Sequence, residues 1–179
     1  MNGLSGNRAR GFTLVELLIV IVIIGILAAL VMVAYGGMQQ RARDSLRQND
    51  IKTIARALEL YYSDNSRYPG GSGSTTINAS WSTTADASWQ NLITALKPYM
   101  SNAPPDPTST PSVSVLGGTG FNYAYFSNTT GNYCGAAQNQ MYILVYRFEG
   151  TSQTNTLNGD CATNPLGPYN NASNYRVVK

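Results

Sequence analysis

The sequence contains no histidine, and only 12% of its 179 residues are charged. Histidine is the commonest catalytic base and the commonest metal ligand, so its absence removes the Ser-His-Asp arrangement and leaves a cysteine nucleophile without an imidazole partner. The sequence also has no glycine-rich phosphate-binding motif that ends in lysine. Asn158, Asp160 and Asn164 supply oxygen atoms, but a single carboxylate makes a poor site for a hard cation. These gaps predict that the protein is not an enzyme and holds neither a cofactor nor a metal.

Cysteine and clustered positive charge are also scarce. Cys134 and Cys161 are the two cysteines, and both lie in the C-terminal half. We expect one disulfide between them if this half is exported from the cell, and two reduced, buried thiols if it is not. The formal net charge is only +3. Nucleic-acid partners are therefore disfavoured, because proteins that bind them usually gather basic residues on one face.

The earliest proline is Pro69, so the first third of the chain has none. Residues 17–35, the apolar run, carry no charge, and at about 1.5 Å per residue a helix of this length crosses the hydrocarbon core of a bilayer, about 30 Å thick. A cleaved secretory signal is shorter and ends at a small-residue site that is missing here. A buried core helix is rarely apolar on all faces over such a length. A plain signal anchor fits, with Arg8 and Arg10 on the cytoplasmic side.

The anchor alone does not explain Glu16, which lies at the start of the apolar run. An acidic side chain costs about 2.5–3.5 kcal/mol at the centre of a membrane helix and less near its end, so an intramembrane carboxylate requires a partner. Residues 11–16 read Gly-Phe-Thr-Leu-Val-Glu, after a short basic leader and before the apolar run. This combination resembles the class III signal peptide of type IV pilins and pseudopilins.

The resemblance implies a processing and assembly pathway. A prepilin peptidase is expected to cut between Gly11 and Phe12 and to methylate the new amine of Phe12. The subunit then waits as a single-pass protein in the cytoplasmic (inner) membrane, in contact with lipid and with an inner-membrane assembly platform, before it joins an extracellular helical filament of identical subunits. There Glu16 is expected to meet the Phe12 amine of a neighbouring subunit. A carboxylate and an ammonium attract strongly in a low dielectric, and such a pair fixes register more surely than it adds stability.

The pattern beyond the apolar run predicts one long helix over residues 13–65. Ile51, Ile54 and Leu58 recur at helical spacing and predict a stripe that a globular domain covers. Asp44 and Arg47 can pair as i,i+3 neighbours, which is worth a few tenths of a kcal/mol at most. We interpret the basic residues of this half as a solvated helix face with subunit contacts rather than as a nucleic-acid or lipid patch.

Residues 61–69, Tyr-Tyr-Ser-Asp-Asn-Ser-Arg-Tyr-Pro, resemble the end of the long helix in many pseudopilins and minor pilins. Many pilins also carry a proline near the middle of the apolar run, and this chain does not. The expected weak points of the helix are therefore Gly25, Gly36 and Gly37. The predicted organisation is a leader peptide at 1–11, a transmembrane or filament-core segment at 12–36, an amphipathic segment at 37–65 and a globular domain at 66–179.

The globular domain is predicted to combine one short helix with a small antiparallel sheet. The expected helix covers residues 87–96, and loops are expected at 70–84 and 101–111. Aromatic and β-branched residues predict strands at 121–126 and 141–148, with a third at 175–178. With the long helix, this makes an α+β fold of the type IV pilin kind. A disulfide between Cys134 and Cys161 also resembles the C-terminal disulfide region of type IV pilins.

The sequence therefore favours a structural subunit of a type IV pilus that serves adhesion, twitching motility or DNA uptake. A pseudopilin of a type II secretion or competence system is the nearest alternative, because the same N-terminal motif serves both. A signal-anchored surface enzyme or receptor is a further alternative, as is a minor pilin that binds DNA at a filament tip.

Overall fold

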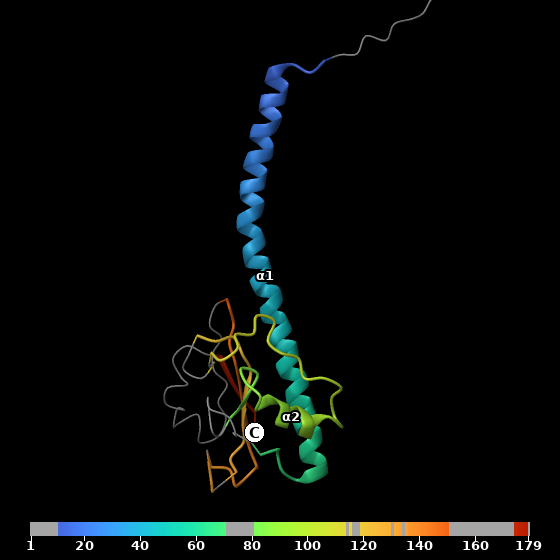
Figure 1. Cartoon of the computed structure of the whole chain (residues 1–179), viewed down its shortest axis with the longest axis vertical. Coiled ribbons are helices and arrows are strands. Elements are labelled where there is room, and N and C mark those ends of the chain that lie inside the picture. The colour runs from blue at the N-terminus through green and yellow to red at the C-terminus, as the bar shows by residue number, and fades with distance from the viewer. Residues whose placement is uncertain are drawn as a thin grey trace, which may run out of the picture. The chain divides into compact units, whose positions relative to one another are not determined.

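The structure is a computed structural model that describes residues 11–70, 81–113, 115, 119–129, 131–133, 135–150 and 174–178. Apart from one additional short strand, its elements follow the predicted order, and the α+β pilin-like fold is confirmed (Figure 1). The chain divides into two compact units, Met1–Gln39 and Gln40–Lys179. The helices and strands are α1 (Leu14–Asn65), β1 (Ser82–Thr83), α2 (Trp89–Leu96), β2 (Ala124–Phe126), β3 (Tyr142–Tyr146) and β4 (Asn174–Val178).

Helix α1 is continuous from Leu14 to Asn65, as the sequence predicts. It stops because Ser66 adopts a left-handed conformation with φ 53°, and its N–H donates to the Tyr62 carbonyl at 2.7 Å. This is the usual way for a helix to close its last turn, although glycine is the commoner residue there. Pro69 then excludes a further helical turn.

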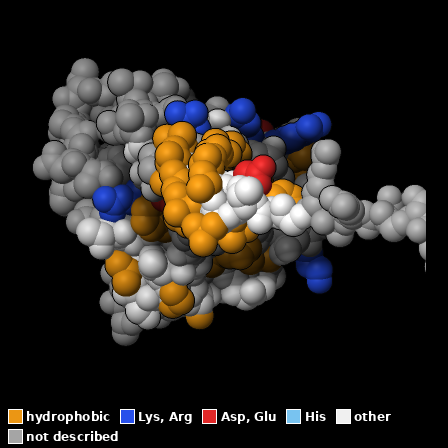
Figure 2. Space-filling model, turned by 90° about the horizontal axis from the view of Figure 1, so that it is seen from above, with side chains coloured by type: hydrophobic (Ala, Val, Ile, Leu, Met, Phe, Trp, Pro, Cys, Tyr) orange, Lys and Arg blue, Asp and Glu red, His pale blue; other side chains and the backbone are white. Residues whose placement is uncertain are grey.

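The first half of α1 presents apolar side chains to its surroundings, and Figure 2 shows hydrophobic side chains gathered on it. The large hydrophobic residues described from Leu14 to Met32 are each at least 50% exposed. Among the described residues, α1 is long and apolar enough to cross a membrane. A helix that is apolar on all faces and unburied in its own chain requires lipid or other helices around it.

The sheet is an antiparallel meander with strand order β1-β2-β3-β4. Tyr125 of β2 lies opposite Leu144 of β3, and Ser82 of β1 lies opposite Tyr125. The short strand β1 corrects the prediction of a loop over residues 70–84. Its two residues, Ser82 and Thr83, are buried and pair with β2, which their polar composition did not indicate.

Two of the predicted strands are shorter than expected. Strand β2 begins at Ala124, and the first two residues of the predicted strand, Phe121 and Asn122, bond to the proline-rich loop instead of the sheet. The Asn122 amide donates to the carbonyls of Thr110 and Val113, each at 2.8 Å, and the Phe121 N–H donates to the Thr110 hydroxyl at 2.8 Å. Strand β3 ends at Tyr146, two residues before the predicted end.

The core of the second unit has two layers, because successive residues of β3 point to opposite faces of the sheet. Tyr142 and Leu144 join the cluster that covers α1, where Ile51, Ile54 and Leu58 are fully buried. The prediction that a globular domain covers the apolar stripe of the long helix is therefore confirmed. The opposite face buries the remaining apolar residues in a smaller cluster: Ile143 and Val145 with Trp81, Val115, Ala124, Ala136 and Met141.

Candidate functional site

The N-terminal motif forms a capping box at the start of α1. The Thr13 N–H and hydroxyl both donate to Glu16 Oε2, at 2.8 and 2.7 Å. In return the Glu16 N–H donates to the Thr13 hydroxyl at 3.2 Å. This reciprocal arrangement satisfies backbone donors that the first turn of a helix leaves unpaired. Thr13 is a residue that sequence reasoning missed, although the Thr-x-x-Glu spacing is a known helix-start signal.

The bond expected to be cut lies next to this box and is open to its surroundings. The Phe12 side chain is 90% exposed, and a side chain built at Gly11 would meet no atom within 4 Å. Both hydrogen bonds from Thr13 reach Oε2 of Glu16, and within the described residues Oε1 accepts none. Since a carboxylate has about four lone-pair sites, Glu16 retains capacity for a second partner while the helix cap stays intact.

Tyrosine hydroxyl groups hold the globular domain to the second half of α1. Three acidic side chains of the helix each accept a hydrogen bond from a tyrosine that follows the helix in sequence. The pairs are Asp50 with Tyr123 at 2.8 Å, Glu59 with Tyr68 at 3.1 Å and Asp64 with Tyr99 at 2.9 Å. Burial raises the pKa of the Asp50 carboxyl, and the hydrogen bond from the Tyr123 hydroxyl only partly offsets this.

A buried arginine completes the attachment of the domain. The Arg47 side chain has no exposed surface and donates to both oxygens of Asp106, at 2.7 and 3.0 Å. It also contacts Asp44 at 2.7 Å and Glu149 at 2.8 Å. Glu149 receives a second guanidinium from Arg43 at 2.5 Å, and this hydrogen bond lowers the pKa of the Glu149 carboxyl. The sequence predicts only the Asp44–Arg47 contact, since Asp106 and Glu149 lie far along the chain.

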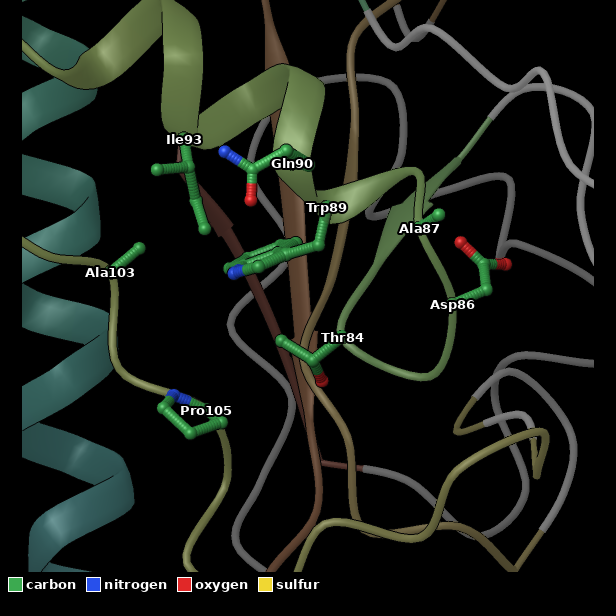
Figure 3. A pocket seen from close by; sticks show the side chains of 8 residues that line it. All are labelled: Thr84, Asp86, Ala87, Trp89, Gln90, Ile93, Ala103 and Pro105. Carbon is green, nitrogen blue, oxygen red and sulfur yellow. The ribbon is translucent and has the colours of Figure 1, made fainter.

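A pocket of about 430 Å³ lies against α2 in the second unit (Figure 3). Its walls are largely apolar, and the Asp86 carboxylate already accepts a hydrogen bond from the Ser88 N–H at 2.7 Å. No pair of acid and base side chains faces the cavity among its lining residues, so the pocket offers no catalytic set. The lining residues are Thr84, Asp86, Ala87, Trp89, Gln90, Ile93, Ala103 and Pro105.

Several predicted site residues lie outside the part of the chain that the structure describes. These are the leader residues 1–10, Cys134, Cys161 and the weak oxygen cluster at 158–164. Gly25, Gly36 and Gly37 are described and lie within α1, and a side chain built at any of them would meet no atom within 4 Å. Packing within the described chain therefore does not require glycine at these three positions.

Comparison with known families gives two matches along the chain. Residues 6–32 match the prokaryotic N-terminal methylation motif. Residues 34–146 match the family described as type II secretion system protein G, which covers more than half of the chain. The two matches adjoin each other near the end of the apolar run.

Individual relatives come from both branches of the predicted family. The chain is 46% identical over 67 residues to the type II secretion system core protein G of Pectobacterium carotovorum, which covers 37% of this chain and 43% of that protein. It is 43% identical over 63 residues to the core protein G of Escherichia coli, a match that covers 35% of this chain and 43% of that protein. It is 41% identical over 61 residues to the type IV major pilin protein PilA of Myxococcus xanthus, a match that covers 34% of this chain and 28% of that protein.

The matched region therefore spans less than half the length of these curated relatives. No solved structure matches the chain.

Proposed function

Because this chain belongs to the type II secretion system protein G family, a family of structural subunits, we propose that it is the precursor of a pseudopilin. In this proposal a prepilin peptidase hydrolyses the bond between Gly11 and Phe12, so that water adds across the bond and Phe12 gains a free amine. Methylation of that amine follows. The mature subunit then moves from the inner membrane, with the help of an assembly platform, into a short helical filament of identical copies.

The observation that carries the proposal is the state of Glu16. Its carboxylate lies at the start of a helix whose first half has unburied apolar residues, and the capping box uses only Oε2. Oε1 is left to accept a hydrogen bond from the Phe12 amine of a neighbouring copy. Both charges lose their hydration in an apolar bundle, so each stabilises the other there. The cap and the contact between subunits can exist together.

Two substitutions separate the capping role of Glu16 from its pairing role. Glu16→Gln keeps a capping side chain, because glutamine serves at this position of a capping box, but it removes the charge. Thr13→Val removes the capping hydroxyl and keeps the charge. We expect Glu16→Gln to abolish filaments and Thr13→Val to retain them. The opposite result, filaments with Glu16→Gln and none with Thr13→Val, would show that Glu16 acts only as a cap.

Processing is tested independently by mass analysis of the N-terminus in the membrane fraction. The proposal expects a chain that begins at methylated Phe12, in the unaltered protein and in both variants. A mature N-terminus at Met1 would favour the plain signal anchor. Measuring cleavage in each variant also ensures that a missing filament reports on assembly and not on the peptidase.

A type IV pilus subunit is the second candidate, and the identity with the Myxococcus major pilin supports it. The sequence alone favours this reading, whereas the family match over residues 34–146 supports the pseudopilin. Shearing cells at the natural level of expression distinguishes the two. Long filaments released by shear identify a pilus, and subunits that stay with the cell envelope identify a pseudopilus.

A further inference from the structure

Three basic side chains lie on one exposed face of α1 and form what we call the basic stripe: Arg41, Lys52 and Arg56. At 3.6 residues per turn they fall within an arc of about 60° and extend over about 22 Å of helix. Each is exposed, and none forms an ion pair with the described residues. Arg43 and Arg47, on the buried side of the same helix, are by contrast fully paired.

A second copy of the chain offers the basic stripe only carboxylates that already accept hydrogen bonds. Every acidic side chain among the described residues accepts at least one hydrogen bond from its own chain. The donors to Asp44, for example, are the Arg47 guanidinium and the backbone N–H groups of Glu149 and Gly150, and Asp64 is bonded by the Tyr99 hydroxyl. Among these carboxylates Glu16 keeps one oxygen without a hydrogen bond, and Glu59 and Asp64 are exposed, so contact with a second copy is the alternative that the test below has to exclude.

Two exposed leucines lie beside the basic stripe, both beyond its Arg56 edge. Leu46 is 54% exposed and Leu60 is 46% exposed. By helical spacing, Leu60 lies about 40° from Arg56 around the helix and Leu46 about 80°. Lysine and arginine on one edge of a helix, with large apolar side chains beside them, are typical of helices that lie in the interface of an anionic membrane.

The membrane is also the nearest anionic surface along the chain. Arg41 follows the last residue of the apolar run, Tyr35, by about 9 Å of helix, which places it at the level of the lipid head groups. We propose that the basic stripe binds the anionic phospholipid head groups of the bilayer that the apolar run spans, before the subunit assembles, which revises the interpretation of these residues as a solvated face with subunit contacts only. This inference rests on the proposed function only in requiring that residues 17–35 be inserted in a membrane.

Contact by the whole stripe has a geometric consequence. Arg56 lies about 31 Å of helix beyond Tyr35, whereas charges are screened over about 8 Å at physiological salt. All three cations can reach head groups only if the second half of α1 lies along the surface. Gly36 and Gly37 lie between the apolar run and the basic stripe, and no packing within the described chain requires glycine there. A glycine pair is where a helix bends most readily.

The test measures how closely the far end of the helix approaches the head groups. The full chain with Ser63→Trp is reconstituted in vesicles that carry nitroxide-labelled head groups. Ser63 is exposed, lies on the same side of the helix as the basic stripe and follows Arg56 by two turns. The two native tryptophans, Trp81 and Trp89, are buried, and the chain without Ser63→Trp provides their background. Insertion is measured separately, by flotation and by resistance to alkaline extraction.

In vesicles of phosphatidylglycerol and phosphatidylcholine we expect clear quenching of the new tryptophan. Lys52→Gln with Arg56→Gln should reduce it at least twofold, whereas Arg67→Gln with Lys97→Gln, which removes the same two residue types elsewhere, should leave it unchanged. Raising the salt from about 0.1 to about 1 M shortens the screening length from about 10 to about 3 Å and should also reduce quenching.

Equal quenching in pure phosphatidylcholine overturns the inference in favour of a contact that does not depend on lipid charge. Quenching that depends on protein density instead of lipid charge overturns it in favour of a contact with a second copy. Absence of quenching in an inserted chain overturns the inference alone. A chain that does not insert overturns the proposed function as well.

Discussion

Replacing Arg47 with methionine tests whether one buried cation holds the domain to the helix. Arg47 contacts three carboxylates, of which Asp106 is also without exposed side-chain surface. Methionine fills a similar volume with a flexible apolar chain, so the change removes charge and hydrogen bonds more than it removes packing. Asp44 keeps two backbone N–H donors and Glu149 keeps Arg43. Asp106 is the carboxylate left without a cation.

Breaking a buried ion pair by removing one partner costs about 3–5 kcal/mol, because the other charge remains buried. Asp106 retains the Thr108 N–H at 2.8 Å and the Thr108 hydroxyl at 3.1 Å, which compensate part of the loss. We therefore expect Arg47→Met to lower the free energy of unfolding by about 3 kcal/mol, the lower end of that range. Adding Asp106→Leu should recover part of this loss, because the uncompensated charge disappears.

The measurement is urea unfolding of the full chain in detergent, followed by tryptophan emission. Trp81 and Trp89 are both buried within residues 40–179, so the signal reports on the globular unit. Arg43→Met is the matched control, since Arg43 also contacts Glu149 but is 30% exposed and should contribute about 1 kcal/mol or less. Two results would refute the assignment of this cost to a buried unpaired carboxylate. One is a similar loss of unfolding free energy in Arg47→Met and Arg43→Met, and the other is a double variant that is less stable than Arg47→Met alone.

Three further substitutions test the tyrosine contacts by the same urea assay. Burial raises the folded pKa of Asp50 above its unfolded value of about 3.9, so ionisation costs stability as the pH rises through that window. In Asp50→Asn the amide oxygen can still accept the hydrogen bond from the Tyr123 hydroxyl. This variant should be more stable than the unaltered chain at pH 7 and similar to it near pH 3. A variant that is less stable at pH 7 contradicts the prediction. Tyr125→Phe leaves the Pro69 carbonyl without its 2.6 Å hydrogen bond and should cost about 1–3 kcal/mol, whereas Tyr99→Phe, whose hydroxyl bond is exposed, should change stability by about 0.5 kcal/mol or less. Equal costs for the two tyrosines would show that burial does not set the value of these bonds.

The sequence predicts the helices and the longer strands well, because the patterns that specify them lie within a short stretch of chain. The continuous helix follows from the uncharged run and from the spacing of Ile51, Ile54 and Leu58, and β3 follows from its aromatic and β-branched residues. Strand β1 could not be predicted in the same way. Ser82 and Thr83 carry no apolar signal, and they form a strand only because β2 supplies the opposite hydrogen-bonding edge.

The residues of the candidate site differ in the same way, because some are recognisable from local sequence and others are not. Glu16 stands out in sequence because a carboxylate is costly in an apolar run, and its neighbours decide its geometry within one helical turn. Arg47 does not stand out. Its principal partner Asp106 is 59 residues away, in a proline-rich loop whose path no local rule gives. The alternating charges of α1 predict a solvated face, but the pattern does not distinguish Arg47, which is buried, from the exposed arginines of the same helix.

The acidic side chains of α1 therefore fall into two groups with different tasks. Those of the second half, such as Asp50 and Asp64, accept hydrogen bonds from the domain and fix it to the helix. Glu16 is bonded only within its own first turn and keeps an oxygen for a partner. A variant that loosens the domain, such as Arg47→Met, can prevent filaments without touching any assembly contact. A loss of filaments identifies Glu16 as a contact between subunits only when the same variant leaves the urea midpoint of the globular unit unchanged.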